Sequence, residues 1–241
     1  MKKAFCGSLR LRFISALMIC LLIISCGCTA KEEPHMSGKA DLKDISLHLP
    51  KSYYVEANVV SSSAFGSTET SYALSENDGW VYMKLGYDRE QYVYKPVSEG
   101  RYIEYRYSTE KGAYLPTMIS EALQQQIDAG NVPIGSVSVG KEAVDAKRRT
   151  LEPYLCAYET LKASLSDSGE EAVKNVRCRV FTGKVNALLT KSDLKFWIDP
   201  ATGLAFRYVN KTKTGLLTTR QEIEITEFSE TAKIPAISMD F

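Results

Sequence analysis

The sequence predicts a mainly β protein of the α+β class, with short antiparallel strands on either side of a helical segment. Eleven of the fourteen tyrosines lie between residues 53 and 115, and aromatic residues favour strands because they pack well on a pleated surface. Apolar and polar residues alternate there with a period of two, as they do again after residue 175. Between these two regions the apolar residues take helical spacing.

The first 25 residues are organised like a signal peptide. Lys2, Lys3, Arg10 and Arg12 form a basic region without any acid, and the apolar residues 13–24 follow it. This apolar stretch is too short to span a hydrocarbon core, which takes about 20 residues. A short apolar run with a basic flank before it and small residues after it is typical of a signal for export.

Residues 23–26 read Ile-Ile-Ser-Cys and resemble the lipobox of bacterial lipoproteins. In that family the cysteine thiol takes a diacylglycerol, the peptidase cuts just before it, and the new amine is often acylated, for example with palmitate. The resemblance implies lipidation at Cys26, since two or three chains anchor a protein stably. Cys28 is a second candidate, but Ser25 would then stand where an apolar residue is expected. An ordinary secretory peptide with a chance cysteine is the other alternative.

Three regions are expected: a lipoprotein signal peptide at 1–25, a flexible tether at 26–46 and a single domain at 47–241. The tether has few apolar residues, so little burial is available to offset the entropy of ordering it. Loss of four basic residues with the signal leaves 26 of the 30 basic side chains against 29 acidic ones, a formal charge of −3. A mildly acidic chain lacks the basic footprint of nucleic-acid binding. The membrane is therefore expected as a partner through the anchor.

Residues 53–115 are expected to form a meander of short antiparallel strands. Val81 and Met83 alternate with Trp80 and Tyr82, and turn residues such as Asn-Asp-Gly at 77–79 separate the runs. Regular spacing of this kind is typical of sandwiches and barrels.

Helices are expected next, over residues 116–128 and 151–165. The first has Pro116 at its start and Gly130 past its end, and the second carries an apolar stripe at helical spacing. Residues between them, 131–140, read as a loop. Strands then resume over residues 176–180, 194–198, 204–210 and 220–228.

Residues 195–207 read Lys-Phe-Trp-Ile-Asp-Pro-Ala-Thr-Gly-Leu-Ala-Phe-Arg and predict a hairpin. Pro200 suits a turn, Asp199 can accept bonds from backbone amides ahead of it, and Gly203 allows positive φ. The unit resembles the hairpin of the lipoprotein-localisation-factor superfamily, the LolA/LolB-like group that includes mycobacterial lipid-carrying lipoproteins. The order of strands, helices and strands resembles that family too, although Ala205 replaces a frequent proline.

The resemblance implies a curved, incompletely closed antiparallel half-barrel whose open side is plugged by helices. It also implies a hydrophobic ligand, such as an acyl chain, between sheet and helices. The apolar residues expected to line that space are Val81, Met83, Ile103, Tyr105, Leu155, Tyr158, Phe196 and Ile198. Each of them could instead fill an ordinary core, because periodicity does not distinguish a lined cavity from a packed one. The family's cavity arginine has no matching position, so no such role is carried over.

Two cysteines of the domain, Cys156 and Cys178, could form a disulfide outside the cytosol, which would stabilise the fold by roughly 3 kcal/mol. Counting 100° per residue places Cys156 opposite the apolar stripe of its helix, whereas Cys178 should point inward. Two unconnected thiols are the alternative.

The sequence gives little support to catalysis. Its two histidines, His35 and His48, lie in or beside the tether. We find no ligand spacing typical of zinc or calcium sites, no nucleophile elbow and no phosphate-binding glycine loop. We therefore expect a protein that is not an enzyme and that uses no metal or other cofactor.

The leading functional expectation is a membrane-anchored, extracytoplasmic lipoprotein at the cell membrane or outer membrane. It would bind an acyl chain or lipid, in lipid or lipoprotein transfer. The alternative is a non-enzymatic interaction or sensing module on the same fold, without a ligand cavity and with an envelope protein as partner. Tyr92, Tyr94, Tyr102 and Arg106 would then form a binding patch, since tyrosine and arginine are enriched at binding hot spots.

Overall fold

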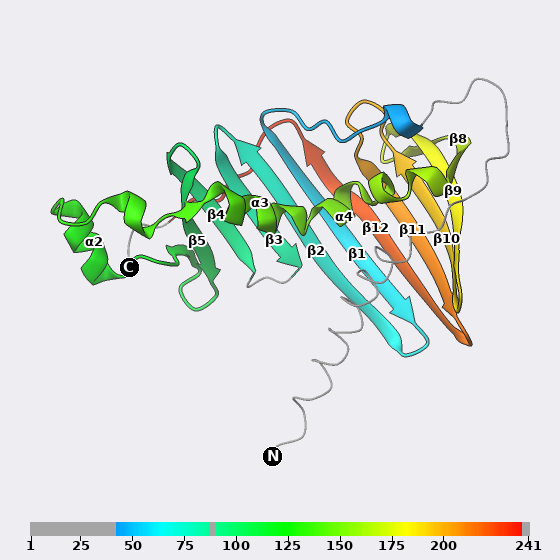
Figure 1. Ribbon diagram of the computed structural model, residues 1–241, viewed down its shortest axis with the longest axis horizontal. Helices are drawn as coiled ribbons and strands as arrows, with labels where there is room; N and C mark the ends of the chain where they lie inside the picture. Colours follow the sequence, from blue (N-terminus) through cyan, green and yellow to red (C-terminus); the bar gives the residue numbers. More distant parts are fainter. Residues whose placement is uncertain (1–41, 87–89, 238–241) are drawn as a thin grey trace, which may run out of the picture.

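The structure is a computed structural model that describes residues 42–86 and 90–237. Its main feature is one antiparallel sheet of twelve strands within these residues (Figure 1). The strands of the first half are β1 (Tyr53–Ser63), β2 (Gly66–Asn77), β3 (Trp80–Gly86), β4 (Gln91–Ser98), β5 (Arg101–Ser108), β6 (Ala113–Pro116) and β7 (Val139–Gly140). Those of the second half are β8 (Leu165–Val173), β9 (Val176–Ala187), β10 (Thr190–Ile198), β11 (Ala205–Thr214) and β12 (Leu217–Ser229).

Strands β1 and β12 pair with each other and so join the two halves of the sheet. Along the sheet the order is β6-β5-β4-β3-β2-β1-β12-β11-β10-β9-β8, and the short β7 also pairs with β5. Within the described part of the chain, β6 and β8 form the two edges and do not pair with each other. The expected incompletely closed antiparallel half-barrel is thereby confirmed.

A chain of short helical pieces crosses one face of the sheet (Figure 1). It consists of α3 (Lys141–Arg149), α4 (Glu152–Leu155), η3 (Ala157–Thr160) and η4 (Lys162–Ser164), and we call residues 141–164 the strap. The expectation of one continuous helix over residues 151–165 is wrong. Cys156 (φ −146°, ψ 43°) and Leu161 (φ −117°, ψ 2°) leave helical geometry, and they divide this segment into short pieces.

The helix expected over residues 116–128 begins later than Pro116 suggested. Residues 113–116 form β6 on the edge of the sheet, and α2 runs over Glu121–Asp128. Ser120 caps it by accepting a hydrogen bond from the backbone N–H of Leu123, which makes Ser120 the start signal. A 3-10 turn, η2 (Ile134–Val137), follows within the segment expected to be a loop.

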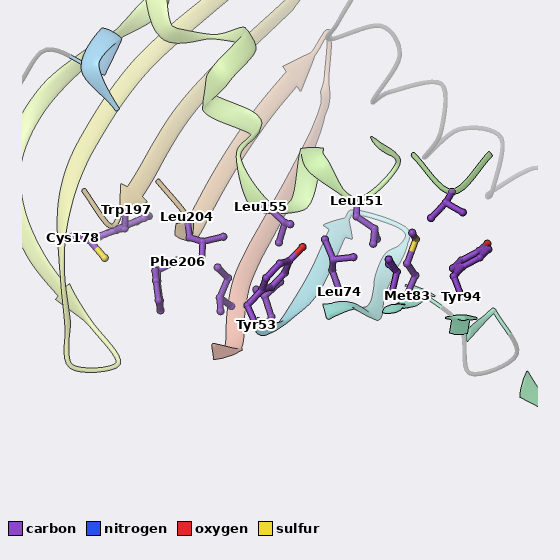
Figure 2. Close-up of a cluster of buried hydrophobic side chains, with 14 of the residues drawn as sticks. Tyr53, Leu74, Met83, Tyr94, Leu151, Leu155, Cys178, Trp197, Leu204 and Phe206 are labelled. Atoms are coloured by element: carbon purple, nitrogen blue, oxygen red, sulfur yellow. The ribbon is translucent and has the colours of Figure 1, made fainter. Parts of the chain in front are cut away.

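Buried apolar side chains form three clusters. One includes Tyr94 and Met83 beneath the strap and extends along the sheet to Cys178 (Figure 2), and a second surrounds Tyr158 and Phe196. The third contains Val93 together with residues from β5 and the segment around α2 and η2. Both faces of the central sheet are therefore covered, one by the strap and the other by the α2–η2 segment and the chain after β12.

The packed domain begins earlier than its composition indicated. The 3-10 turn η1 (Leu42–Asp44) places Leu42 and Ile45 in the second cluster, although both residues belong to the range expected as tether. Lys162 of the strap donates to the carbonyl of Ile45 at 2.6 Å. One helical turn brings these two apolar residues to the same side, and their burial fixes residues 42–46 against the domain.

The β10–β11 turn holds this N-terminal segment in place. Asp199 accepts hydrogen bonds from the backbone N–H groups of Ala201 and Thr202, as its place in the turn predicted. The carbonyl of Thr202 accepts from the backbone N–H of His48 at 2.7 Å. Gly203 has φ +70°, and a Cβ there would lie 2.1 Å from the carbonyl oxygen of Ser46. This turn therefore has room for glycine alone at position 203.

A pair of alanine substitutions measures that close approach. Gly112 has φ +63° with no atom within 4 Å of its Cβ position, so Gly112→Ala should cost only the left-handed strain of about 1 kcal/mol. Gly203→Ala adds the clash with Ser46 and should cost at least about 2 kcal/mol more in free energy of unfolding, measured by urea denaturation. Equal losses in both variants would mean that the N-terminal segment moves away without cost.

Candidate functional site

The interface between strap and sheet is apolar along most of its length. Leu151 and Leu155 reach from the strap toward Leu74 and Tyr53 of the sheet (Figure 2). Further along, Tyr158 meets Phe196 edge to face, with ring centroids 6.3 Å apart. The apolar stripe that the sequence showed in this region is real, although it lies on several short helices.

Six of the eight residues expected to line a ligand space share the strap interface. Val81, Met83 and Leu155 lie in the first cluster, and Tyr158, Phe196 and Ile198 lie in the second. All six are buried.

The structure does not bring Ile103 and Tyr105 to this interface. Residues that are partners on neighbouring strands share a face of the sheet. Val93 of β4 is the partner of Tyr82 and of Tyr105, so these residues face away from Met83, and all of them lie in the third cluster with Ile103. Placing Ile103 and Tyr105 on the inner face was wrong, because alternation within a strand does not give the register between strands.

The space between strap and sheet is nearly filled. A hollow of about 10 Å³ remains there, lined by Val55, Leu74, Leu151, Leu155 and neighbouring residues. Pockets that hold small ligands usually have about 300–1,000 Å³. In this conformation the interface is packed as a core and leaves no room for an acyl chain at that point.

A larger hollow of about 240 Å³ lies at the β8–β9 end of the sheet. It is lined by Glu170, Arg177, Cys178, Arg179 and Pro200. The carboxylate of Glu170 pairs with both arginines. Charged walls of this kind do not suit an apolar ligand.

Two tyrosines join the clusters beneath the strap. Tyr72 of β2 and Tyr154 of α4 stack with ring centroids 3.9 Å apart, and the hydroxyl of Tyr154 donates to that of Tyr72 at 3.2 Å. Both pack against the first and the second cluster. The apolar face beneath the strap is thus continuous. Sequence reasoning placed Tyr154 on the apolar stripe but gave no sign of its partner, which is 82 residues earlier.

Ion pairs fasten one end of the strap to the sheet. Lys147 lies 3.0 Å from the carboxylate of Glu104 and 3.4 Å from the ring centre of Tyr92. Its neighbour Arg148 lies 2.9 Å from the carboxylate of Glu76. We call these two ion pairs the latch. The run of basic residues at 147–149 is visible in the sequence, but its acidic partners are not.

The carboxylate of Glu104 is held in its charged form. Burial by itself raises the pKa of Glu104, but hydrogen bonds from Tyr94, Lys147 and Thr117 outweigh it and lower the pKa below its usual value. The hydroxyl of Tyr94 donates to Glu104 at 2.7 Å, and Thr117 donates at 3.0 Å. Three donors on one carboxylate make this the most constrained part of the latch.

At its other end the strap is tied to the β10–β11 turn. The hydroxyl of Tyr158 donates to the carbonyl of Gly203 at 2.7 Å, and burial is the largest cause that raises the pKa of this hydroxyl. The strap therefore rests on the same turn that holds residues 46–48.

The tyrosine patch considered from the sequence is largely covered. Tyr92, Tyr94 and Arg106 do share one face, because Tyr92 and Arg106 are strand partners. Tyr94, however, is only 1 % exposed, and Lys147 of the strap lies over its ring. Tyr102, on the same face, packs against the first cluster. An open binding patch is not present at these residues.

Both cysteines of the domain are free thiols. Cys178 is fully buried in the first cluster, as its alternation predicted, whereas Cys156 ends α4 and packs against the second cluster. The disulfide that the sequence left open is therefore not formed, because the two thiols pack in different clusters of the core. Burial raises the pKa of Cys156 to about 12 and that of Cys178 to about 11.

Cys26, where lipidation is expected, lies outside the described residues, as do the expected signal peptide and most of the expected tether. Within residues 42–86 and 90–237, no group of histidine, cysteine and carboxylate side chains is arranged to hold a metal ion. In the same residues, no helix has the length and apolar character needed to cross a membrane.

Comparison with known proteins gives similarity in structure alone. No protein-family model matches the sequence, and no curated protein matches it either. Similar solved structures include lipoprotein LppX of Mycobacterium tuberculosis, which is 9% identical with a TM-score of 0.29 over 77% of this chain and 89% of that chain. A putative outer membrane lipoprotein-sorting protein domain from Vibrio parahaemolyticus is 6% identical, with a TM-score of 0.23 over 74% and 84%.

A LolA superfamily protein from Nitrosomonas europaea is also similar. It is 10% identical, with a TM-score of 0.20 over 80% of this chain and 93% of that chain.

The latch should weaken in acid. Because its pKa is lowered in the folded protein, Glu104 contributes stability above about pH 4.3, its usual pKa, and loses it as the pH falls through the lowered value. The destabilisation caused by Glu104→Gln, measured by urea unfolding, should therefore be larger at neutral pH than at acidic pH. Glu110→Gln, in the exposed β5–β6 turn, is the control and should show no such dependence. A pH-independent effect of Glu104→Gln would contradict the role of its charge.

Proposed function

We propose that the protein binds a hydrophobic ligand, an acyl chain or lipid, beneath the strap, and that the strap opens to admit it. The observation that carries this proposal is the continuous apolar face under a strap made of short helices. Helices of four to nine residues have little stability of their own, so this strap depends on its contacts with the sheet. Such a segment can leave the sheet without unfolding the strands.

The free energy that opening the strap costs is similar in size to the free energy that burying an acyl chain gains. The strap buries Val144, Leu151, Leu155, Tyr158 and Leu161. Exposing each large apolar side chain costs about 1.5–3 kcal/mol, which sums to on the order of 10 kcal/mol. An acyl chain gains about 0.8 kcal/mol per buried methylene, so about 15 methylenes offset that cost. A ligand that replaces the strap's side chains on the sheet therefore makes the open state accessible.

The latch and the hydrogen bond of Tyr158 then keep the strap closed on the sheet. Two ion pairs at one end and a hydrogen bond at the other hold the strap through polar contacts. Polar contacts of this kind exchange readily with water once the strap lifts. The carboxylates of Glu76 and Glu104 would remain on the sheet beside the opening.

We also propose that the protein acts outside the cytoplasm, anchored in an envelope membrane through Cys26. The signal-peptide and lipobox pattern of residues 1–26 supports this location. Together with the strap, it favours a stationary protein that receives or holds a lipid at a membrane surface, in lipid or lipoprotein transfer, without enzymatic activity.

A second candidate function is an interaction or sensing module that holds no ligand. The observation that favours it is the hollow of only about 10 Å³ beneath the strap. In that case the strap would be a permanent part of the core, and an envelope protein would be the partner.

Uptake of a fluorescent long-chain fatty acid separates the two functions. The double variant Lys147→Ala/Arg148→Ala weakens the latch and should speed uptake about 5- to 30-fold, as expected for 1–2 kcal/mol less stability of the closed strap. The control is Lys141→Ala, on the same helix, whose salt bridge is with Asp145 within that helix. Its uptake rate should equal that of the natural protein.

Native mass spectrometry of protein from a lipid-containing host provides the second measurement. We expect a co-purified acyl lipid that is lost on delipidation. No bound lipid, together with no fatty-acid uptake by the natural protein or by the latch variant, would overturn ligand binding in favour of the interaction module.

A further inference from the structure

Three hairpin turns at one edge of the sheet carry exposed apolar side chains. They are the β1–β2, β9–β10 and β11–β12 turns, which Figure 1 shows along the same lower edge. Leu188 and Leu216 are fully exposed, and Phe65 is 82% exposed. Leu189 and Leu217 beside them are exposed as well. We call these five residues the apolar tips.

The strand register brings the apolar tips into one row. Thr190 at the end of one hairpin is the partner of Ala187 and of Thr214, and Thr214 is the partner of Leu217. The β9–β10 and β11–β12 turns are therefore level and adjacent. Ser63, two residues before Phe65, is the partner of Thr219, so the β1–β2 turn ends close to the same level. Neighbouring strands lie about 4.8 Å apart, which makes the row continuous across six strands.

Turn chemistry does not explain these residues. Two-residue hairpin turns favour Asn and Gly, which readily adopt positive φ. The β8–β9 turn at the opposite edge follows this rule, with Lys174 and Asn175 both at positive φ. The β9–β10 turn instead has two leucines in water. Exposed apolar residues that do not help a turn to form are expected where the surface binds a partner.

Basic residues flank the apolar tips. Within four residues of a tip lie Lys184, Lys191, Lys213 and Arg220, against two acids, Glu69 and Asp193. Lys191 and Lys213 stand directly opposite each other on β10 and β11. Like charges in this position destabilise a sheet, and a negatively charged surface would relieve that repulsion.

We propose that the apolar tips form a membrane-docking edge that inserts into an anionic lipid bilayer, with the flanking basic residues on the headgroups. Exposed leucine and phenylalanine at the ends of turns can enter the headgroup–acyl boundary without disturbing the strands behind them. Lysine and arginine beside them match the negative surface potential of anionic lipids. This surface is separate from the strap, and its role does not depend on whether a ligand binds beneath the strap.

Vesicle co-sedimentation tests this docking edge directly. The chain without residues 1–26 lacks the proposed anchor and keeps every residue that the structure describes. It should bind vesicles of phosphatidylcholine mixed with phosphatidylglycerol, and bind less with phosphatidylcholine alone or at high salt. Leu188→Ser/Leu189→Ser should reduce vesicle partitioning at least about tenfold, since burial of the leucine side chains drives insertion.

Two matched variants complete the experiment. Met118→Ser/Ile134→Ser removes two exposed apolar residues away from the tips and should leave partitioning unchanged. Lys191→Gln/Lys213→Gln should weaken binding to the anionic vesicles and reduce its dependence on salt. Thermal unfolding checks that each variant is folded.

Three outcomes would overturn the proposal. The first is no vesicle binding by the natural sequence, and the second is an equal loss with the Met118/Ile134 control. The third is a dimer, seen by sedimentation analysis, that forms without vesicle binding and is lost in the leucine variant. That result would assign the apolar tips to self-association.

Discussion

An open sheet with apolar side chains on both faces needs other segments to cover those side chains, and the rest of this structure follows from that constraint. The sheet has twelve strands within the described residues and carries apolar side chains on both sides. A closed barrel hides one face inside itself, whereas this sheet relies on added segments. The strap covers one face, and the α2–η2 segment with the chain after β12 covers the other face over strands β1 to β6. The binding proposed beneath the strap would therefore compete with the packing that keeps the sheet stable.

Strands whose two faces differ could be predicted from the sequence, since alternation is a local property. The meander over residues 53–115 and the four later strands are all present. The edge strand β8 was missed because Ser166 to Glu171 contain no apolar residue and most of them are exposed. The helix α3 was missed because Val144 is its one buried residue. Pro153 stands in the first turn of α4, where proline is tolerated, so it gives no sign of the breaks at Cys156 and Leu161.

The candidate site was harder to predict than the fold, because it depends on register and on distant partners. The inward direction of Val81, Met83, Phe196 and Ile198 follows from alternation. Alternation does not show which residues of neighbouring strands lie on the same face of the sheet, and Ile103 was misplaced for that reason. Lys147 and Glu104 of the latch are 43 positions apart, and no local pattern in the sequence indicates such a pair. Lys147 could be recognised as basic, but its position over Tyr92 needed the folded chain.

The chain enters the domain at the edge opposite the apolar tips. Residues 46–48 are bound to the β10–β11 turn, whereas the tips lie at the far ends of the long strands. β12 has 13 residues, a length of about 43 Å at 3.3 Å per residue. The sheet thus acts as a fixed spacer between the point where the chain joins the domain and the docking edge. A domain built in this way sets a distance, so that the strap stands at a defined height between the end that leads to the proposed anchor and the edge proposed to dock.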